Sequence, residues 1–173
     1  MSLEEEIEKT YLVAHIPIDL KGAKSKKIVD VYIPGNLSKP SLRLRQSGDV
    51  FTLTKKVKID PHDASTHTEH TIPLTSEEFV ELRKNGKEIE KTRYYFDFQD
   101  QPCKLDVFEG KLAGLVIADF EFRSPETYQK FIQPDFCLID ITQEDFIAGK
   151  NLAGKSVAEL KIDLDRLNYT LII

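Results

Sequence analysis

Most of the first 122 residues alternate between apolar and polar side chains with a period of two. This period is typical of β-strands whose two faces meet different surroundings, because successive side chains point to opposite sides of a sheet. The alternation predicts about eight strands, and short turn signals such as residues 47–49 favour antiparallel hairpins over long crossovers. The expected strand ranges are 4–13, 28–33, 41–46, 50–59, 66–72, 88–98, 103–109 and 115–122.

Helical signals occur in two other regions, 75–85 and 124–170. The second region opens with Ser124 and Pro125, which suit the N-cap and the first position of a helix. The basic stretch 21–27 is expected to be a solvated loop. No linker, repeat or shift in composition divides the chain. We therefore expect an α+β fold in a single domain that covers residues 1–173.

Charge and composition limit the partners that this chain can bind. The net charge of −5 gives no general attraction for nucleic acid or for an anionic membrane. The N-terminus is acidic where a secretory signal would be basic and then apolar, and no apolar run approaches the roughly 18 residues that a membrane span needs. Cys103 and Cys137 lie far apart without a C-x-x-C spacing, so both are expected to be reduced. We therefore expect a cytoplasmic protein that binds neither nucleic acid nor membranes.

The stretch GKNLAGKS, residues 149–156, matches the Walker A pattern of nucleotide-binding P-loops letter for letter. A true P-loop needs a strand that leads into its first glycine and a parallel sheet around it. Here the residues before Gly149 look like a helical turn that Gly149 would end, and the upstream strands have hairpin spacing. We therefore predict a helix end followed by a loop rather than a P-loop, with Lys155 exposed or facing a site made by other strands.

Five of the expected strands carry two like charges two residues apart, which places both charges of a pair on one face of the strand. The pairs are Glu6 with Glu8, Arg43 with Arg45, Lys56 with Lys58, Lys91 with Arg93, and Asp119 with Glu121. One such pair alone is usually the solvated face of a sheet. Here the acidic pairs lie on the first and last strands and the basic pairs lie between them, and like charges repel unless they share a counter-ion.

A closed barrel would turn one face of each strand toward its interior, so these charges would line a wet channel that holds a ligand. Hard cations such as Mg²⁺ prefer carboxylate oxygens and often bind substrate phosphates at the same time. Arginine pairs with two phosphate oxygens at once through its planar guanidinium group. The charge pairs therefore predict a metal-dependent site for a phosphorylated anion.

Several of these stretches resemble motifs of the CYTH superfamily, the triphosphate tunnel metalloenzymes. EIEKTYLV resembles the opening E-x-E-x-K strand, LRLRQSGDVFTLTKK resembles an R-x-R hairpin that ends in a lysine, and IEKTRYYF resembles a K-x-R strand. KLDVFEGKLAGLVIADFEF resembles the D-x-F-x-G hairpin that leads to the second acidic pair. The likeness runs from about Glu4 to Gly154. It implies a closed eight-stranded antiparallel β-barrel, or tunnel, with flanking helices, in which Mg²⁺ or Mn²⁺ helps to hydrolyse or cyclise a triphosphate.

The resemblance also implies roles for the residues at matching positions. The implied metal ligands are Glu6, Glu8, Asp119 and Glu121, with Asp119 at a position where the family more often has glutamate. The implied phosphate-binding residues are Arg43, Arg45, Lys56, Lys91 and Arg93, and Glu69 and Asp106 would add acidic groups to the tunnel. Glu8, Lys56 and Arg93 are the expected catalytic residues. Glu8 would orient or deprotonate the attacking water, and the two cations would neutralise charge on the phosphate oxygens.

Two positions depart from the family pattern. Thr10 replaces the lysine of the opening motif, and Thr71 replaces a second glutamate that is expected after Glu69. Lys9 cannot take the place of the missing lysine, because it lies on the opposite face of the strand. We expect the loss of this lysine to affect the catalytic rate, the choice of substrate or the presence of activity.

The leading hypothesis is a triphosphatase that acts on a small triphosphate, inorganic tripolyphosphate first, by attack of water on the terminal phosphoryl group. Hydrolysis of a nucleoside or thiamine triphosphate and cyclisation of ATP are alternatives within the same family. A non-catalytic module that binds polyphosphate or a nucleotide, motivated by Thr10 and Thr71, is a second class of function, and a purely structural sheet protein is a third. A homodimer is a further possibility that the sequence leaves open.

The segment DPHDASTHTEH, residues 60–70, contains three histidines among acidic residues. They are His62, His67 and His70. Their spacing matches no strong zinc pattern. A polar loop that enters a strand is the favoured interpretation of this segment, and a zinc site is the alternative.

Overall fold

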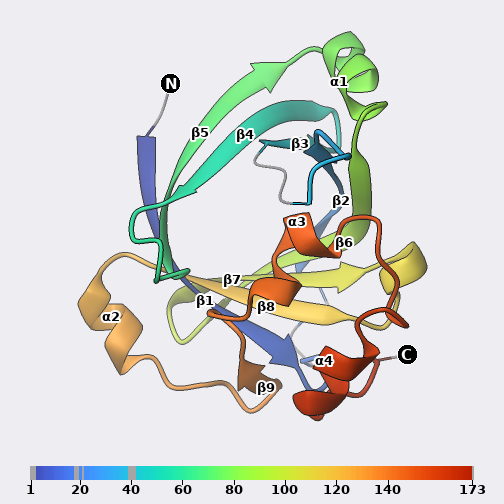
Figure 1. The fold of residues 1–173 in the computed structure, drawn as a ribbon. Coiled ribbons are helices and arrows are strands. Elements are labelled where there is room, and N and C mark those ends of the chain that lie inside the picture. Colours follow the sequence, from blue (N-terminus) through green and yellow to red (C-terminus); the bar gives the residue numbers. More distant parts are fainter. Residues whose placement is uncertain (1–2, 18–19, 21, 39–41, 173) are drawn as a thin grey trace.

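The computed structural model describes residues 3–17, 20, 22–38 and 42–172, with side chains described from residue 7 onward. Within these residues the chain forms nine strands and four short α-helices (Figure 1). The strands are β1 (Leu3–Val13), β2 (Lys24–Ile33), β3 (Leu42–Ser47), β4 (Val50–Lys58), β5 (Thr66–Leu74), β6 (Lys87–Phe98), β7 (Gln101–Phe108), β8 (Val116–Phe122) and β9 (Cys137–Asp140). The helices are α1 (Ser76–Arg83), α2 (Pro125–Lys130), α3 (Gly149–Leu152) and α4 (Lys161–Arg166), with 3-10 turns at Gly110–Leu112 and Asp145–Ile147.

The first eight strands close into an antiparallel barrel. The strand order of the whole sheet, with β9 included, is β5-β4-β3-β2-β6-β7-β8-β1-β9. An additional pairing between β5 and β1 closes the first eight strands into a ring. β9 pairs with Tyr11–Val13 at the end of β1, whereas β5 pairs only with the first residues of β1, up to Ile7. Figure 1 shows the strands curving round into the barrel, with α1 at the top, α2 and α4 in the lower part and α3 near the centre of the view. The predicted α+β class and the predicted eight-stranded barrel are therefore confirmed.

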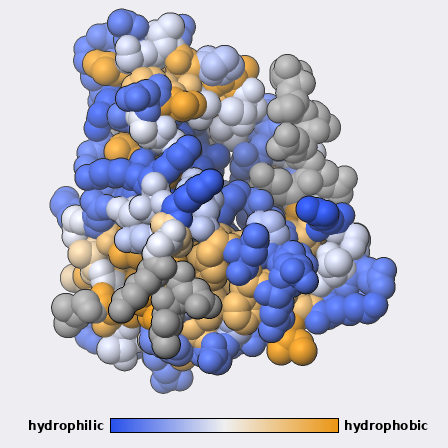
Figure 2. Space-filling model, turned by 180° about the vertical axis from the view of Figure 1, so that it is seen from behind, coloured by the Kyte–Doolittle hydropathy of each residue, from blue (hydrophilic) through white to orange (hydrophobic). Residues whose placement is uncertain are grey.

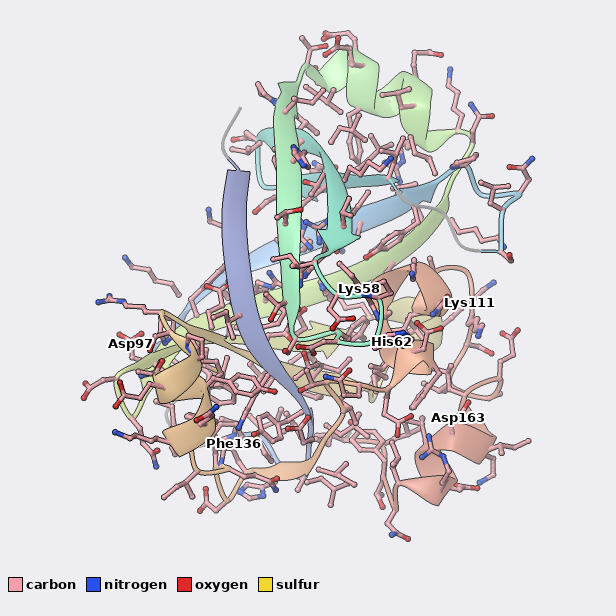
Figure 3. The ribbon with its side chains drawn as sticks, turned by 60° about the vertical axis from the view of Figure 1, so that its left-hand side comes forward. Lys58, His62, Asp97, Lys111, Phe136 and Asp163 are labelled. Atoms are coloured by element: carbon pink, nitrogen blue, oxygen red, sulfur yellow. The ribbon has the colours of Figure 1, made fainter. Side chains whose placement is uncertain are left out.

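Apolar side chains on the outer face of β1, β7 and β8 form the largest aromatic cluster, packed beneath α2 and the segment after it. Phe120 lies at its centre, with its ring centroid 4.7 Å from that of Phe131 and 6.4 Å from that of Phe136. Figure 3 shows Phe136 beside α2, outside the barrel. Both cysteines are buried as free thiols in this cluster, which agrees with the predicted reduced state.

A second apolar cluster closes one end of the barrel. Ile89, Phe108 and Ile117 from three strands meet Leu152 of α3 and Leu164 of α4 there. A third, smaller cluster holds α1 against β2 and β3 through the buried ring of Phe79. The inside of the barrel therefore has one apolar end, while its middle keeps the polar side chains of the strands.

Two parts of the fold differ from the sequence prediction. Lys24–Lys27, predicted as part of a solvated loop, begin β2 and pair with Thr92–Tyr95 of β6. Their exposed lysines hide the strand from the alternation pattern, because backbone hydrogen bonds to β6 hold it rather than burial of side chains. The region 124–170 was predicted to be mainly helical, but it contains β9 and only short helices. Here the last residues of β1 offer β9 an edge that local sequence does not reveal.

No helix in the described part of the chain is long and apolar enough to cross a membrane. Figure 2 shows the rear face of the molecule, where hydrophilic residues cover most of the surface and hydrophobic residues gather in the lower half.

Candidate functional site

A cavity of about 410 Å³ lies inside the barrel. Every one of the strands β1 to β8 contributes inward-facing side chains to it, and so does the segment between β9 and the end of α3. Most of the lining side chains from the strands are charged or polar. The charged ones are Glu8, Asp30, Arg43, Arg45, Lys56, Lys58, Glu69, Lys91, Arg93, Lys104, Asp106, Asp119 and Glu121. Figure 3 shows Lys58 where β4 passes into the loop before β5.

The segment that contains α3 borders the apolar end of this cavity. Ile141, Ile147 and Leu152 line the cavity from this segment. Gly149 allows the segment to approach the barrel wall, since a Cβ atom at this position would lie 2.0 Å from the hydroxyl oxygen of Tyr32. The charged part of the cavity is therefore bounded at one end by apolar side chains, and a larger residue at position 149 would require the Tyr32 ring or α3 to shift.

One side of the cavity, which we call the basic wall, consists of Arg45, Lys91 and Arg93 with the buried carboxylates Asp30 and Asp106. Arg45 donates two hydrogen bonds to Asp30, at 2.6 and 2.7 Å. Arg93 donates two to Asp106, at 2.6 and 2.7 Å, and Lys91 donates a third at 2.5 Å. These paired bonds fix the cations from behind, because a planar guanidinium group binds both oxygens of a carboxylate.

The pKa values of the two buried carboxyl groups show how strongly the basic wall is held. Burial alone would raise the pKa of Asp106, but Lys91 and Arg93 outweigh burial and lower it to about 2. Burial opposes ionisation of Asp30 as well, yet Arg45 and Lys91 hold the pKa of Asp30 well below its usual range. Burial also lowers the pKa of Lys91, against the pull of Asp106. The basic wall therefore keeps its carboxylates ionised without an external ligand.

Arg43 and Lys56 are less tightly held than the basic wall. Arg43 Nη2 lies 3.7 Å from Glu69 Oε1, and Arg43 Nε is buried with no hydrogen-bond partner among the described residues. Lys56 Nζ lies 3.1 Å from Glu8 Oε1 and 3.7 Å from Glu69 Oε1. A buried N–H group without an acceptor is costly, so Arg43 has donor capacity that an anionic ligand in the cavity could use.

The adjoining side, which we call the acidic wall, consists of Glu8 and Thr10 on β1 and Asp119 and Glu121 on β8, the strand that pairs with β7 of the basic wall. Glu8 is paired in register with Glu121, and Thr10 with Asp119. The Thr10 hydroxyl donates a hydrogen bond of 2.8 Å to Asp119 Oδ1. Burial and the charges of Glu8 and Asp106 together raise the pKa of Asp119 to about 6, against the lowering effects of Arg93 and Thr10. The acidic wall therefore carries more negative charge than its neighbours neutralise.

The donor set of the acidic wall fits a hard divalent cation, because it offers carboxylate oxygens whose mutual repulsion a cation would relieve. Glu8 and Glu121 are turned toward lysines instead, with Lys56 at Glu8 and Lys104 at Glu121. Accordingly, no cluster of three or more metal-binding side chains is already formed among the residues that the structure describes. The side chain of Glu6 lies outside the described residues, although its backbone belongs to β1.

With the exception of Glu6, the residues that the sequence singled out for the tunnel all line this one cavity. Sequence reasoning missed Asp30, Tyr32, Thr54, His67 and Lys104, which line it as well. Lys104 lies two residues from Asp106 on the same strand face, so its inward direction followed from a predicted tunnel residue, whereas Asp30 has no such neighbour. The second departure from the family pattern, Thr71, forms a neutral pair with Thr54 through a hydrogen bond of 2.9 Å.

The fold shows where the histidine segment and the Walker A match lie relative to the barrel. His67 is buried, with Nε2 at 3.8 Å from Glu8 Oε1, whereas His62 lies in the loop before β5 (Figure 3). Gly149 follows a 3-10 turn and not a strand, as expected for a chance match. The prediction that Gly149 ends a helix is wrong, since Gly149 begins α3 where the close contact with Tyr32 requires a glycine. Lys155 does not line the cavity.

Comparison with known proteins places the chain among relatives of the same fold. No protein-family model matches it. An inorganic triphosphatase of Nitrosomonas europaea is 32% identical over 149 residues, which are 86% of this chain and 96% of the relative. A solved structure of an inorganic triphosphatase is 30% identical with a TM-score of 0.64, and the match covers 86% of this chain and 93% of that chain. A putative adenylate cyclase from Bacillus halodurans shares the fold alone, with a TM-score of 0.52 at 16% identity over 100% of this chain and 95% of that chain. The chain belongs to the CYTH superfamily of triphosphate tunnel metalloenzymes.

Proposed function

We propose that this protein hydrolyses a small triphosphate, inorganic tripolyphosphate first, inside its barrel and with the help of a divalent cation. The observation that carries this proposal is the division of one cavity into a basic wall and an acidic wall on adjoining strands. A triphosphate carries several negative charges that need cations, and the metal ion that accompanies phosphates needs carboxylate oxygens. The relative that is named an inorganic triphosphatase supports the same substrate class.

In this proposal the phosphate groups bind to Arg43, Arg45, Lys56, Lys91 and Arg93. Arg43 is the residue with the clearest need for such a ligand, because its Nε is buried without an acceptor among the described residues. Asp30 and Asp106 hold the other arginines in place from behind. The donors are therefore oriented before the substrate arrives, which lowers the reorganisation that binding and reaction require.

Glu8, Asp119 and Glu121, together with Glu6, would hold the cation, and Mg²⁺ and Mn²⁺ are the proposed ions. A bound divalent cation of this kind lowers the pKa of a water molecule and neutralises negative charge on the phosphate oxygens. Thr10 orients Asp119 through its hydroxyl group. Lys56 and Lys104 must then release Glu8 and Glu121, and the phosphates offer both lysines new partners.

The proposed reaction follows from the position of Glu8, which belongs to the acidic wall and also contacts Lys56. A water oxygen attacks the terminal phosphorus atom, and the water proton passes to the Glu8 carboxylate. The bond from that phosphorus atom to the bridging oxygen breaks, so phosphate and pyrophosphate are the products. Lys56 and Arg93 neutralise the charge that gathers on the leaving oxygens. The proposed catalytic residues are therefore Glu8, Lys56 and Arg93.

The test compares phosphate release from tripolyphosphate, ATP and thiamine triphosphate, with Mg²⁺ and then with Mn²⁺. We expect tripolyphosphate to be hydrolysed fastest, and Glu121→Gln to lower its turnover on the order of 100-fold or more. Glu126→Gln is the matched control, because it removes a carboxylate whose exposed partner is Lys130 on α2. Pyrophosphate release from ATP without phosphate release would instead support a cyclase. Binding of tripolyphosphate with no turnover of any substrate would contradict hydrolysis.

We also propose that the protein forms a homodimer, and light scattering of the purified protein would test this: a monomeric mass would contradict it.

A further inference from the structure

Lys104 is a cavity residue that neither the charge pairs nor the family motifs pointed to. It lies on β7 between Cys103 and Leu105, which are buried in the outer aromatic cluster. Because side chains alternate along a strand, Lys104 faces inward, and it lines the cavity together with Asp106. Its ammonium group contacts the Glu121 carboxylate of the acidic wall.

The strand register places Lys104 in one row with the position where this chain lacks a lysine. Lys104 is paired with Asp119 across β7 and β8, and Asp119 is paired with Thr10 across β8 and β1. The Cα atoms of Lys104 and Thr10 are therefore about 10 Å apart, two strand spacings across the sheet. A lysine side chain at either end of this row can reach the pair formed by Glu8 and Glu121, which lies in the neighbouring row.

Two lysines in fact bracket that pair of carboxylates. Lys56 reaches Glu8 from β4, on one side of the acidic wall, and Lys104 reaches Glu121 from β7, on the other side. The side chains of Lys104 and Glu121 are 29% and 33% exposed to the cavity, whereas those of Lys91 and Asp106 are 9% and 3% exposed. The contact of Lys104 is therefore far less enclosed than the contacts of the basic wall, and Lys104 can exchange its partner when a ligand enters.

We propose that Lys104 binds the substrate and replaces, from β7, the lysine that the family motif places at position 10 on β1. In the protein without ligand its ammonium group neutralises Glu121. When a cation occupies the acidic wall, Glu121 turns to the cation, and the Lys104 ammonium group donates its hydrogen bonds to the oxygens of the terminal phosphoryl group. This proposal rests on the proposed function, because it assigns a contact to the same triphosphate.

The test uses Lys104→Met, Lys104→Arg and the double variant Lys104→Met with Thr10→Lys. Lys130→Met is the matched control, since it breaks one exposed lysine–glutamate pair on α2. Calorimetry measures two affinities separately, that of tripolyphosphate in EDTA and that of Mn²⁺ without any phosphate. Steady-state kinetics with tripolyphosphate and Mg²⁺, and a melting temperature, are recorded for each variant.

We expect Lys104→Met to weaken tripolyphosphate binding in EDTA by about ten- to a hundredfold, as for the loss of a charge-assisted hydrogen bond. Its affinity for Mn²⁺ should stay the same or increase, because a cation that competes for Glu121 has been removed. Thr10→Lys in the same chain should restore at least about tenfold of the lost tripolyphosphate affinity, and Lys104→Arg should keep most of it. A purely structural role for Lys104 could not be rescued from another strand.

Two results would overturn the assignment of Lys104 while leaving the proposed function intact. The first is wild-type binding of tripolyphosphate by Lys104→Met, which would limit Lys104 to its pair with Glu121. The second is an equal loss of Mn²⁺ and tripolyphosphate affinity with a lowered melting temperature, which would assign Lys104 to packing. If the wild-type protein itself neither binds nor hydrolyses tripolyphosphate, the proposed function fails and the assignment fails with it.

Discussion

The two walls of the cavity carry opposite charges, and they differ in how these charges are held. On the basic wall, Arg45 binds Asp30 and Arg93 binds Asp106 through paired hydrogen bonds. On the acidic wall, Glu8 on β1 lies opposite Glu121 on the neighbouring strand β8, so two like charges are paired. Repulsion of this kind, added to burial, raises the pKa of Asp119. The basic wall therefore carries cations and counter-ions that are locked together by buried hydrogen bonds, whereas the carboxylates of the acidic wall depend on the more exposed Lys56 and Lys104 of neighbouring strands.

This difference shows that one tunnel uses two strategies for a charged interior. Donors that are fixed by buried carboxylates need no reorganisation when an anion arrives, so they favour fast and specific binding. Carboxylates that repel one another store unfavourable energy, and a cation releases that energy when it binds. Changes to the two walls should consequently have opposite effects on stability.

The largest effect is expected from breaking the basic wall with Asp106→Asn. This change leaves the buried cations Lys91 and Arg93 without their counter-ion, and we expect the free energy of unfolding to fall by about 3–5 kcal/mol. Urea denaturation measures the change. Asp163→Asn on α4, whose carboxylate lies 3.9 Å from Arg166, is the control and should change stability by about 0.5 kcal/mol or less. A loss below about 1 kcal/mol for Asp106→Asn would mean that the basic wall does not depend on this carboxylate.

A divalent cation that binds to the acidic wall should raise the stability of the protein, whereas breaking the basic wall lowers it. At a Mn²⁺ concentration of 100 times Kd, binding to the folded state alone stabilises the protein by about 2.7 kcal/mol. Thermal unfolding with Mn²⁺ and with EDTA should show this gain in the wild type and much less of it in Glu121→Gln. Equal stabilisation of both proteins would place the cation outside the acidic wall.

The acidic wall should also give stability a pH dependence that the basic wall does not. The folded-state pKa of Asp119 is about 6 and its usual value is 3.8, so the folded protein holds an extra proton between these values. Stability therefore decreases as the pH rises from about 4 to about 6. In EDTA, Asp119→Asn should be as stable as the wild type near pH 4 and more stable by about 1–3 kcal/mol at pH 7. A difference between the two proteins that does not change with pH would refute this origin of the effect.

Asp106 works in the opposite sense, because its folded-state pKa of about 2 lies below the usual 3.8. The stability that it contributes is present above pH 4 and is lost as the pH falls toward 2. The wild type should thus show an additional loss below pH 4 that Asp106→Asn lacks, measured by the same pH series.

The smallest effect is expected from the neutral pair of Thr54 and Thr71. Thr71→Val leaves the buried Thr54 hydroxyl without its partner and should cost about 1 kcal/mol. The double change to valine at both positions should recover most of this loss, because no polar group is then left unpaired. If the single change were as costly as Asp106→Asn, ordinary hydrogen bonds and not charge would hold the interior together.

The period-two alternation predicted the strands and most of the charged interior, whereas the closed eight-stranded barrel was predicted from the resemblance to the CYTH superfamily. Inward-facing residues recur every second position, so pairs such as Arg43 and Arg45 were assigned to one face without knowledge of the fold. Asp30 was missed because a lone carboxylate between valines shows no partner until β3 lies beside β2. Lys104 was missed for a similar reason, since only the register reveals that it lies opposite Asp119.

The segment after β8 was the least predictable part of the chain. Its 3-10 turns and short helices have no sustained periodicity, and they are held by the barrel end that they cover rather than by their own propensities. Gly149 illustrates this, because the need for a glycine comes from the hydroxyl group of Tyr32 on a distant strand.

The strand topology also predicts which of the two walls forms first during folding. The carboxylate–guanidinium pairs of the basic wall join neighbouring hairpin strands, with sequence separations of 15 for Asp30 and Arg45 and of 13 for Arg93 and Asp106. The bond between Thr10 and Asp119 in the acidic wall spans a separation of 109. Contacts between distant residues require costly loop closure and form late, and the first strand leaves the ribosome long before β8 exists. We therefore expect the like charges of the acidic wall to meet late in folding, so that their repulsion does not affect the earlier steps; a faster folding rate of Asp119→Asn in EDTA, with an unchanged unfolding rate, would contradict this order.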